Sequence, residues 1–400
     1  MTHLDLPPTE DALLERQSAR RVAAFERAKT APFYKEALRG MDAATILEPD
    51  AWRAIPILDK EQLRALSSQA FYEDFCLAPR SAIAEFWRSG GSTGRPLYYP
   101  RTLADVEYGL IGFQRVLQCA GFTKEDITHL SLPLGIHPAG HLMGRAATHA
   151  EMGVVWAGGG NTLPSAMQIE MMRLFQPSAW IGMASYGLQL ANLARADGFD
   201  LTTAGINKIL CTAEPLSASK RAKLSDVFGA DVRDSFGMTE MMMLGAEDAA
   251  CEGFRFWADY AYPEVLDPDT FAPVAEGEAG LLVVTALVTN NATPFLRWNT
   301  GDIVTLRKGT PQGTAYDVFP VIKHTHRTAG FVKVRGVNIG FTDFEDLMFR
   351  TPEVADFRAA ITFDGTADHL KLFMETAPAA PADATDTVAG IIKHTFEITP

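Results

Sequence analysis

The sequence has few cysteines, fewer basic than acidic residues and no long apolar run. Its four cysteines, Cys76, Cys119, Cys211 and Cys251, are scattered without any Cys-x-x-Cys pair. This spacing indicates neither a disulfide framework nor a thiolate zinc site, and a reducing compartment such as the cytoplasm fits it best. The N-terminus lacks a basic segment followed by an apolar one, and no apolar run approaches the roughly 18 residues of a membrane-spanning helix. We therefore predict a cytoplasmic protein that is neither secreted nor embedded in a membrane.

The shortage of basic residues also limits the partners. Lysine and arginine number 36 against 49 aspartate and glutamate residues, which gives a formal net charge of -13. Nucleic acids and anionic membranes attract basic surfaces, so this charge argues against both as partners. With 400 residues, of which 47% are hydrophobic and 21% charged, the chain has a globular composition and the length for two or more domains.

Short apolar runs alternate with helix-like segments through the first part of the chain. Helical periodicity predicts helices over residues 9–38, 58–70 and 103–120. The runs "HLSLPL", "GVVWAG", "AWIGMA" and "NKILCTAE" each precede a further helix-like segment. This alternation is typical of an α/β fold, in which mostly parallel sheets are covered by helices.

The pattern changes after about residue 252. Segments such as "GEAGLLVVTALV" and "AYDVFPVIK" are separated by glycine, proline and asparagine, which predicts antiparallel strands in a barrel-like subdomain over 252–326. A second boundary precedes "TDFEDLMFR", a predicted helix with Thr342 as its cap. We expect an N-terminal domain over 1–326, a connection at 327–335 and a small α+β domain over 336–400.

Several short motifs do not carry a function. "GGSTGRP" lacks the lysine and the longer glycine spacing of a P-loop, and "MASYG" lacks the first glycine of a nucleophile elbow. His137 and His141 have the spacing of zinc-binding helices, but Pro138 and Gly140 lie between them and are expected to break such a helix. The pair "HTH" at 324–326 is no stronger as a metal site.

Five stretches in a fixed order indicate a family. They are "SGGSTGRP" at 89–96, "TAEP" at 212–215, "DSFGMTE" at 234–240, "NTGD" at 299–302 and "HRTAGFVKVRGVNI" at 326–339. This series resembles the adenylate-forming enzymes, specifically the phenylacetate–CoA ligase branch, over nearly the whole chain. The resemblance implies that ATP and Mg²⁺ convert an aromatic carboxylic acid to an acyl-adenylate, whose acyl group then passes to coenzyme A.

The glycine-rich stretch resembles the loop that holds the triphosphate in this family. Backbone N–H groups and hydroxyls close to the phosphates offset their charge, so that pyrophosphate can leave. The residues that the resemblance implies for this loop are Ser89, Gly90, Gly91, Ser92, Thr93 and Gly94. Arg95 stands where the family usually has lysine, which keeps the charge but replaces a point cation with a planar fork.

The other motifs resemble the nucleotide site. In "DSFGMTE" the resemblance implies that Phe236 lies against adenine, Thr239 contacts the α-phosphate and Glu240 holds Mg²⁺. Taken alone, Phe236 could equally be a core aromatic and Glu240 a carboxylate in the first turn of a helix. The remaining residues implied at the nucleotide are Asp234 at the adenine amine, Ser235, Gly237, Met238 and the adenine wall of Ala213, Glu214 and Pro215.

Two further residues are implied at the ribose, and three at the acyl group. Asp302 would accept hydrogen bonds from the ribose hydroxyls, unless it is an ordinary turn aspartate, and Arg327 matches the hinge arginine that also meets the ribose. His137, His141 and Tyr186 fall in regions that line the carboxylate pocket of relatives. The acid is expected to be phenylacetate or a larger ring acid.

Two departures concern the second half of the reaction. The family hinge carries two acidic residues where this chain has Ala329 and Gly330, although Gly330 could still act as a pivot and Lys333 matches the pattern that follows. The C-terminal lysine of the family has no counterpart, because Lys393 lacks its motif and the chain ends about where that segment would begin. We therefore expect a shortened C-terminal domain. Two alternatives stay open: transfer to another acceptor, such as a carrier protein, amine or reductase, or an inactive nucleotide-binding relative. A homodimer is also open.

Overall fold

The structure is a computed structural model that describes residues 4–88, 96–327, 331–334, 337–363, 368–396, 398 and 400. The chain divides into two units, each with its own interior. Unit 1 comprises residues 1–163 and 233–325, and unit 2 comprises residues 164–232 and 326–400.

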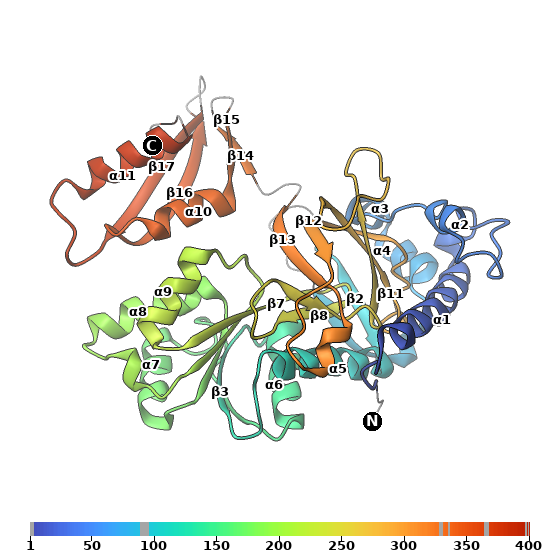
Figure 1. Cartoon of the computed structure of the whole chain (residues 1–400), viewed down its shortest axis with the longest axis horizontal. Helices are drawn as coiled ribbons and strands as arrows, with labels where there is room; N and C mark the ends of the chain where they lie inside the picture. Colours follow the sequence, from blue (N-terminus) through green and yellow to red (C-terminus); the bar gives the residue numbers. More distant parts are fainter. Residues whose placement is uncertain are drawn as a thin grey trace. The chain divides into compact units, whose positions relative to one another are not determined.

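The order of elements follows the predicted alternation (Figure 1). The helices are α1 Glu10–Lys29, α2 Pro49–Arg53, α3 Lys60–Ala65, α4 Ser68–Ala70, α5 Leu103–Cys119, α6 Pro138–His149, α7 Ser165–Phe175, α8 Ala184–Ala196, α9 Ala218–Phe228, α10 Phe341–Arg350 and α11 Ala384–Phe396. The strands are β1 Ile83–Arg88, β2 Tyr98–Thr102, β3 Ile127–Ser131, β4 Gly153–Trp156, β5 Ala179–Gly182, β6 Lys208–Cys211, β7 Asp231–Met238, β8 Met242–Glu247, β9 Phe254–Phe256, β10 Ala261–Leu266, β11 Ala279–Ala286, β12 Trp298–Arg307, β13 Val321–Arg327, β14 Phe331–Val334, β15 Val337–Gly340, β16 Val354–Phe363 and β17 Asp368–Thr376.

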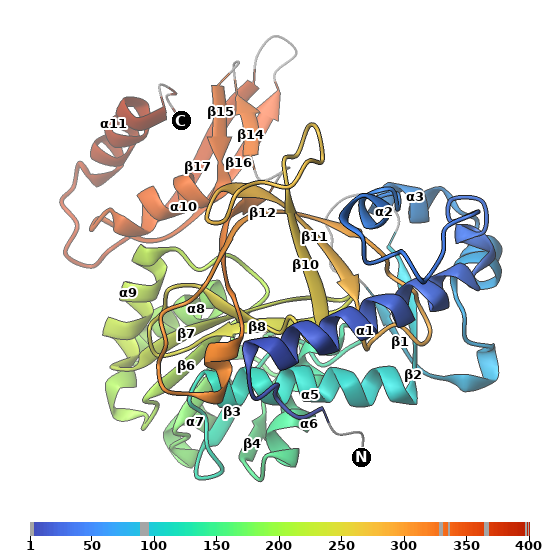
Figure 2. The same ribbon diagram turned by 45° about the vertical axis from the view of Figure 1, so that its right-hand side comes forward.

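Unit 1 is built on strands of both directions. β3 and β4 form a parallel pair, whereas β10, β11, β12, β13, β9, β8 and β7 follow one another in a sheet whose register is antiparallel at β10–β11–β12 and at β13–β9–β8–β7. Helices α1 and α5 run along this sheet (Figure 2). Helix α5 begins at a capping box, in which Thr102 and Asp105 bond each other's backbone N–H. The α/β fold predicted from the sequence is confirmed. Antiparallel pairing occurs well before residue 252, between β1 and β2 and again between β7 and β8.

The "HPAGH" segment corrects one expectation. Pro138 and Gly140 do not break a helix, because α6 begins at Pro138 with His137 as its N-cap residue. Proline is tolerated at the first helical position, where its missing N–H would have no partner in the helix. Gly140 packs so closely that an added Cβ would lie 2.4 Å from the carbonyl oxygen of Pro133. The lack of a side chain at Gly140 therefore allows α6 to pack closely against the preceding loop.

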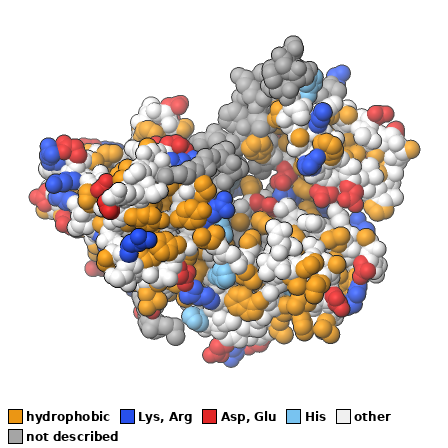
Figure 3. All heavy atoms as spheres, turned by 180° about the vertical axis from the view of Figure 1, so that it is seen from behind, with side chains coloured by type: hydrophobic (Ala, Val, Ile, Leu, Met, Phe, Trp, Pro, Cys, Tyr) orange, Lys and Arg blue, Asp and Glu red, His pale blue; other side chains and the backbone are white. Residues whose placement is uncertain are grey.

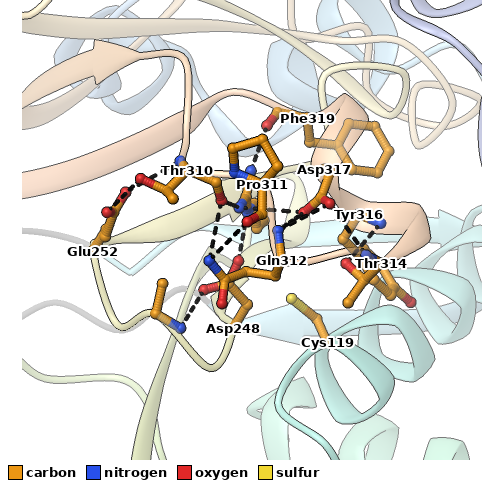
Figure 4. A network of polar contacts seen from close by, with 12 residues as sticks. Cys119, Asp248, Glu252, Thr310, Pro311, Gln312, Thr314, Tyr316, Asp317 and Phe319 are labelled. Atoms are coloured by element: carbon orange, nitrogen blue, oxygen red, sulfur yellow. Dashed lines mark hydrogen bonds and ion pairs between the residues drawn. The ribbon is translucent and has the colours of Figure 1, made fainter.

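A buried polar network holds the connection between β12 and β13 (Figure 4). Arg255 on β9 is 1% exposed, and its Nε donates to Asp248 at 2.6 Å while its guanidinium also bonds the carbonyl of Thr310. Asp317 in turn accepts from the backbone N–H of Gln312 at 2.9 and 3.0 Å. This connection is thus tied to β9, and it sets the positions of two strands that contribute to the candidate site.

Unit 2 has two apolar cores. Residues 164–232 pack α7, α8 and α9 around the parallel pair β5–β6, with Trp180, Leu224 and Phe228 at the centre. The C-terminal segment pairs β14 with β15 and β16 with β17, and packs α10 and α11 around residues such as Met348 and Ile392. Its mixture of hairpins and helices is the α+β arrangement predicted for this segment.

The cap predicted for α10 is wrong by two residues. The helix begins at Phe341 with Gly340 as its N-cap residue, so Thr342 lies inside the first turn. An extended glycine can take the N-cap position without a side-chain bond, and the strand β15 that ends at Gly340 fixes where the helix begins.

Polar contacts join α9 to the C-terminal segment within unit 2. The Ser219 hydroxyl donates to Asp346 at 2.5 Å, and Lys223 Nζ donates to the carbonyl oxygens of Val354 at 3.1 Å and Ala355 at 3.0 Å. Phe349 of α10 also packs against the core of residues 164–232.

In the part of the chain that the structure describes, no helix has both the length and the apolar character needed to cross a membrane. Figure 3 shows hydrophobic side chains on one face of the molecule in separate groups among charged ones.

Candidate active site

The first part of the candidate site is the turn between β7 and β8, which carries Thr239 and Glu240. The two strands pair antiparallel up to Met238 and Met242, and Met242 adopts a positive φ of 72°. An added Cβ at Gly237 would lie 2.6 Å from the carbonyl oxygen of Met242, so only glycine allows the strands to come this close. The "FGMTE" segment is thus a tight hairpin that presents a threonine and a glutamate side by side.

Strand β2 supports this turn from beneath. The Tyr99 hydroxyl donates to Glu240 Oε1 at 2.8 Å, and Arg101 Nη2 donates to the carbonyl oxygens of Thr239 and Glu240, each at 2.7 Å. Tyr99 and Arg101 are both 0% exposed and lie two residues apart, so they share one face of the strand. Burial and the adjacent Glu240 carboxylate raise the pKa of Tyr99 well above its ordinary value, which keeps the phenol a donor.

Two further groups lie close to Glu240. Lys60, the first residue of α3, places its Nζ 3.6 Å from Glu240 Oε1. Burial lowers the pKa of His137, and the negative charge of Glu240 acts in the opposite direction, so the imidazole lies within electrostatic reach of this carboxylate. His141, one turn further along α6, is exposed. His137 is thus half-buried in unit 1, with its pKa influenced by Glu240, whereas His141 is on the surface.

The second part of the candidate site lies around Phe236, further back on β7. Its ring stacks on Phe254 at a centroid distance of 5.6 Å and lies 6.5 Å from the ring of His324. His324 Nε2 is 3.2 Å from Oδ1 of Asp302, a carboxylate that is 7% exposed. An aromatic face and a buried carboxylate that share one histidine are suited to a base and the hydroxyls of its sugar.

Asp234 and Ser235 occupy the buried middle of β7. The backbone N–H of Asp234 donates to Glu247 Oε2 at 2.8 Å, and the Asp234 carboxylate accepts from the N–H of Ser235 at 2.8 Å. Both residues are at most 6% exposed. Asp234 is therefore held in place by its neighbours on the hairpin β7–β8.

The "TAEP" loop, predicted as the adenine wall, lies in unit 2. Ala213 has a positive φ of 72°, a strained backbone for a residue with a side chain. Glu214 accepts hydrogen bonds from the N–H of Ser185 at 2.6 Å and from its hydroxyl at 2.7 Å, and Lys220 Nζ lies 3.3 Å away. Tyr186 follows Ser185 on α8, and its hydroxyl is 3.0 Å from that of Ser165. The carboxylate of Glu214 is thus engaged at the start of α8, while Ala213 and Pro215 are exposed.

Some predicted residues lie outside the described part of the chain. Residues 89–95, which include the whole predicted phosphate loop and Arg95, are outside the described residues, as is Gly330. The backbone of Arg327 ends β13 and that of Lys333 lies in β14, but their side chains are not described. Their roles stay predictions.

Sequence reasoning missed Tyr99, Arg101, Lys60 and His324 as site residues. One signal was present, since an arginine two residues after a tyrosine in "LYYPRT" directly follows the glycine-rich stretch. Alternate residues of a strand share a face, so this pair pointed to one buried polar surface. Lys60 and His324 gave no local signal.

The comparison with known families decides what this arrangement belongs to. The AMP-binding enzyme family matches residues 37–287. The chain belongs to the AMP-binding enzymes. This AMP-binding enzyme is 28% identical over 390 residues to the phenylacetate-coenzyme A ligase of Aromatoleum evansii, covering 94% of this chain and 85% of the relative. It is 27% identical over 380 residues to the enzyme of the same name from Thermus thermophilus, with 93% and 83% covered. The resemblance drawn from the five motifs is confirmed.

Solved structures show the same fold for this AMP-binding enzyme. A 2-hydroxyisobutyryl-CoA ligase in the postadenylation state, in complex with R3-HIB-AMP, aligns with a TM-score of 0.83 at 22% identity, covering 98% of this chain and 84% of the other. An anthranilate CoA ligase in complex with anthranoyl-AMP aligns with a TM-score of 0.56 at 16% identity, covering 78% and 60%.

Proposed function

We propose that this AMP-binding enzyme activates an aromatic carboxylic acid with ATP and transfers the acyl group to coenzyme A. In the first step a carboxylate oxygen attacks the α-phosphorus of ATP, the bond to pyrophosphate breaks and acyl-AMP forms. In the second step the thiolate of coenzyme A attacks the acyl carbon, and AMP leaves with the bonding electrons. The shared name of the curated relatives, phenylacetate-coenzyme A ligase, supports both steps.

The observation that carries the proposal is the course of β7. Near its C-terminal end the strand brings Phe236 beside His324, which contacts Asp302, and the turn that follows the same end presents Thr239 and Glu240. A single strand thus connects two groups of side chains. The aromatic ring of Phe236 and the carboxylate of Asp302 are suited to a nucleoside. The hydroxyl of Thr239 and the carboxylate of Glu240 are suited to phosphates and their metal ion. We assign adenine to Phe236 and Asp234, the ribose to Asp302, and the α-phosphate to Thr239.

The residues at the turn fit Mg²⁺. Among the described residues, no group of three or more histidine, cysteine, aspartate or glutamate side chains forms a metal cage, so a metal there would need phosphate oxygens as ligands. Mg²⁺ takes such a site readily, because it binds through one or two carboxylates together with substrate phosphates. Glu240 would hold the ion, which when bound offsets the charge on the phosphates. Its contacts with Tyr99 and Lys60 both go to Oε1.

For the parts of the site in unit 2 and in the glycine-rich stretch, the proposal rests on the sequence. We assign the triphosphate to Ser89–Gly94 and Arg95, the adenine wall to the backbone of Ala213–Pro215, and the hinge to Gly330 and Lys333, with Arg327 near the ribose. We assign the acyl group to His137 and Tyr186 from the family resemblance, and Tyr186 follows the residue that bonds the "TAEP" loop. His141 stays a weaker candidate because it is exposed.

The thiols support a reducing compartment, and we propose the cytoplasm. The structure describes all four cysteines and none of them forms a disulfide, and Cys76, Cys119 and Cys211 are buried. Free buried thiols are typical of proteins kept in reducing surroundings.

Two assays test the proposal. Labelled pyrophosphate should exchange into ATP only when an acid from a panel of aryl carboxylates is present, and coenzyme A should then be consumed as a thioester. Exchange without thioester formation would replace coenzyme A by another acceptor, such as an acyl carrier protein or an amine. No acid-dependent exchange across the panel would contradict the proposal.

A further inference from the structure

Arg101 is a buried arginine whose guanidinium donates hydrogen bonds to the backbone of the Thr239–Glu240 turn. It is 0% exposed, and its Nη1 donates to the hydroxyl of Thr293 at 2.6 Å while Nη2 bonds the two carbonyl oxygens of the Thr239–Glu240 turn. Its Nε is buried without an acceptor among the described residues. Burying a charge is unfavourable unless hydrogen bonds compensate, and an unmet Nε adds to that penalty. The guanidinium is thus oriented by the turn, even though its own hydrogen bonding stays incomplete.

The turn depends on such support. The ladder between β7 and β8 ends at Met238 and Met242, and a backbone bond inside the turn runs from the N–H of Met241 to the carbonyl of Met238 at 3.2 Å. The carbonyls of Thr239 and Glu240 point out of the ladder, toward β2. The direction of each Cα–Cβ bond is set by the orientation of the two peptide planes that flank the residue. Hydrogen bonds that fix the carbonyls of Thr239 and Glu240 therefore also fix the directions in which their side chains leave the backbone.

The same strand also connects to the glycine-rich stretch. β2 begins at Tyr98, two residues after Pro96, the last residue of that stretch, and it carries Tyr99 and Arg101 on one face. Tyr99 holds the Glu240 carboxylate and Arg101 holds the backbone beneath it. The rings of Trp87, at 5.3 Å, and Phe295, at 6.0 Å, enclose the guanidinium and keep water away from it.

We propose that Arg101 is a positioning residue for adenylation: it locks the Thr239–Glu240 backbone so that the hydroxyl faces the α-phosphate and the carboxylate faces Mg²⁺. This inference rests on the proposed function. It predicts that loss of Arg101 lowers the rate of the chemical step and the affinity for the Mg²⁺-bound nucleotide, while metal-free nucleotide and acid bind nearly as before.

The test compares three variants. Arg101→Met removes all the contacts, Arg101→Lys keeps the charge without the planar fork, and Thr293→Val removes the Nη1 acceptor but leaves both carbonyl bonds in place. We expect kcat of pyrophosphate exchange to fall about 100-fold in Arg101→Met, as misplacement of reacting groups by about 1 Å can cause. Arg101→Lys should be intermediate, and Thr293→Val should stay within about threefold of the wild type. The KM for the acid should change little in all three variants.

A binding measurement separates positioning from stability. In calorimetric titrations with α,β-methylene ATP, Arg101→Met should weaken binding about tenfold with Mg²⁺ present and hardly at all without it. Equal losses in Arg101→Met and Thr293→Val, or an unchanged kcat in a folded Arg101→Met, would overturn the inference. If Arg101→Met does not fold, the same comparison is made between Arg101→Lys and Thr293→Val, and equal kcat values in these two variants would overturn the inference.

A third measurement separates this inference from the proposed function. If the wild type shows no exchange with any acid, the proposed function fails, and hydrogen exchange at the turn then tests Arg101 alone. The Met241 amide should lose protection in Arg101→Met and keep it in Thr293→Val. Unchanged protection in Arg101→Met would overturn the positioning role, whatever the activity.

Discussion

Two glutamates from the two units illustrate how similar motifs can use one residue type differently. Glu240, in unit 1, has its backbone held by Arg101 and its carboxylate held through Oε1 by Tyr99 and Lys60. Glu214, in unit 2, uses Oε1 and Oε2 on the N–H and hydroxyl of Ser185. The Glu240 carboxylate is held through one oxygen by side chains of other elements, whereas the Glu214 carboxylate holds the start of α8 through both oxygens.

The difference follows from what surrounds each carboxylate. The N-terminus of a helix offers N–H donors and the positive end of its dipole, so a carboxylate bound there stabilises the helix. Lys220, which is 1% exposed, adds a buried cation between Glu214 at 3.3 Å and Glu345 at 2.6 Å. Glu240 is held instead by side chains, the hydroxyl of Tyr99 at 2.8 Å and the ammonium of Lys60 at 3.6 Å. We infer that the Glu240 carboxylate serves chemistry and the Glu214 carboxylate serves stability, with the backbone of the "TAEP" loop left for adenine.

The largest expected effect separates the two residues by activity. Glu240→Gln keeps the shape and an acceptor for Tyr99 but removes the charge that would hold Mg²⁺, so kcat of pyrophosphate exchange should fall by about 100-fold or more. Glu214→Gln is the matched control, and its kcat should stay within about threefold of the wild type. Similar losses in both variants would erase the distinction between the two carboxylates.

We expect the loss of Asp302, like the loss of Glu240, to affect function rather than stability. Asp302→Ala removes the buried acceptor that we assign to the ribose, so affinity for ATP should fall about tenfold or more with the fold intact. Isothermal titration measures the affinity, and circular dichroism monitors the fold. An unchanged affinity in a folded variant would rule out the ribose role.

Loss of the Glu214 carboxylate should lower the stability of the protein. Glu214→Ala removes two hydrogen bonds at the start of α8 and one of two carboxylates beside Lys220, so the free energy of unfolding should fall by about 1–2 kcal/mol. Urea denaturation followed by tryptophan fluorescence measures this change. A large rise in the KM for ATP without loss of stability would instead assign the Glu214 carboxylate to the nucleotide.

The smallest effect is a pH dependence at His137. Burial lowers the pKa of His137 below its ordinary value of 6.5, so the unfolded chain binds a proton more readily than the folded one. Its contribution to stability is therefore complete above about pH 6.5 and is lost as the pH falls toward the lowered pKa. The effect should not exceed about 1 kcal/mol, and His137→Gln should remove it from denaturation curves recorded between pH 7.5 and 5.5. Parallel curves for both proteins would contradict the assignment.

The sequence was sufficient for the parts of the fold that have local signals. Apolar runs such as "AWIGMA" and "NKILCTAE" correspond to β5 and β6, and the helix predicted over 103–120 is α5, Leu103–Cys119. Their periodicity and caps lie within a few residues of one another, so they can be read without tertiary contacts. The "FGMTE" turn was located for a similar reason, because its residues are contiguous.

The support beneath the turn could not be predicted in this way. Arg101 and Glu240 are 139 positions apart, and nothing near Arg101 in the sequence indicates which carbonyls it bonds. The predictions at Thr342 and Pro138 were wrong because they relied on local preference alone. Threonine favours a helix cap, but the end of strand β15 sets where α10 begins. Proline favours a helix break, but it is tolerated at the first position of α6. Local rules place elements, whereas contacts between distant segments place the chemistry.

The seam between α9 and the C-terminal segment is made mostly of ions and hydrogen bonds. Lys220 meets Glu345, Ser219 meets Asp346, and Lys223 caps the carbonyls of Val354 and Ala355, with Phe349 the main apolar contributor. Attraction between charges weakens as counterions accumulate around them. High ionic strength should therefore weaken the contacts between α9 and the C-terminal segment. The two apolar cores on either side should stay folded, because burial of apolar side chains does not depend on attraction between charges.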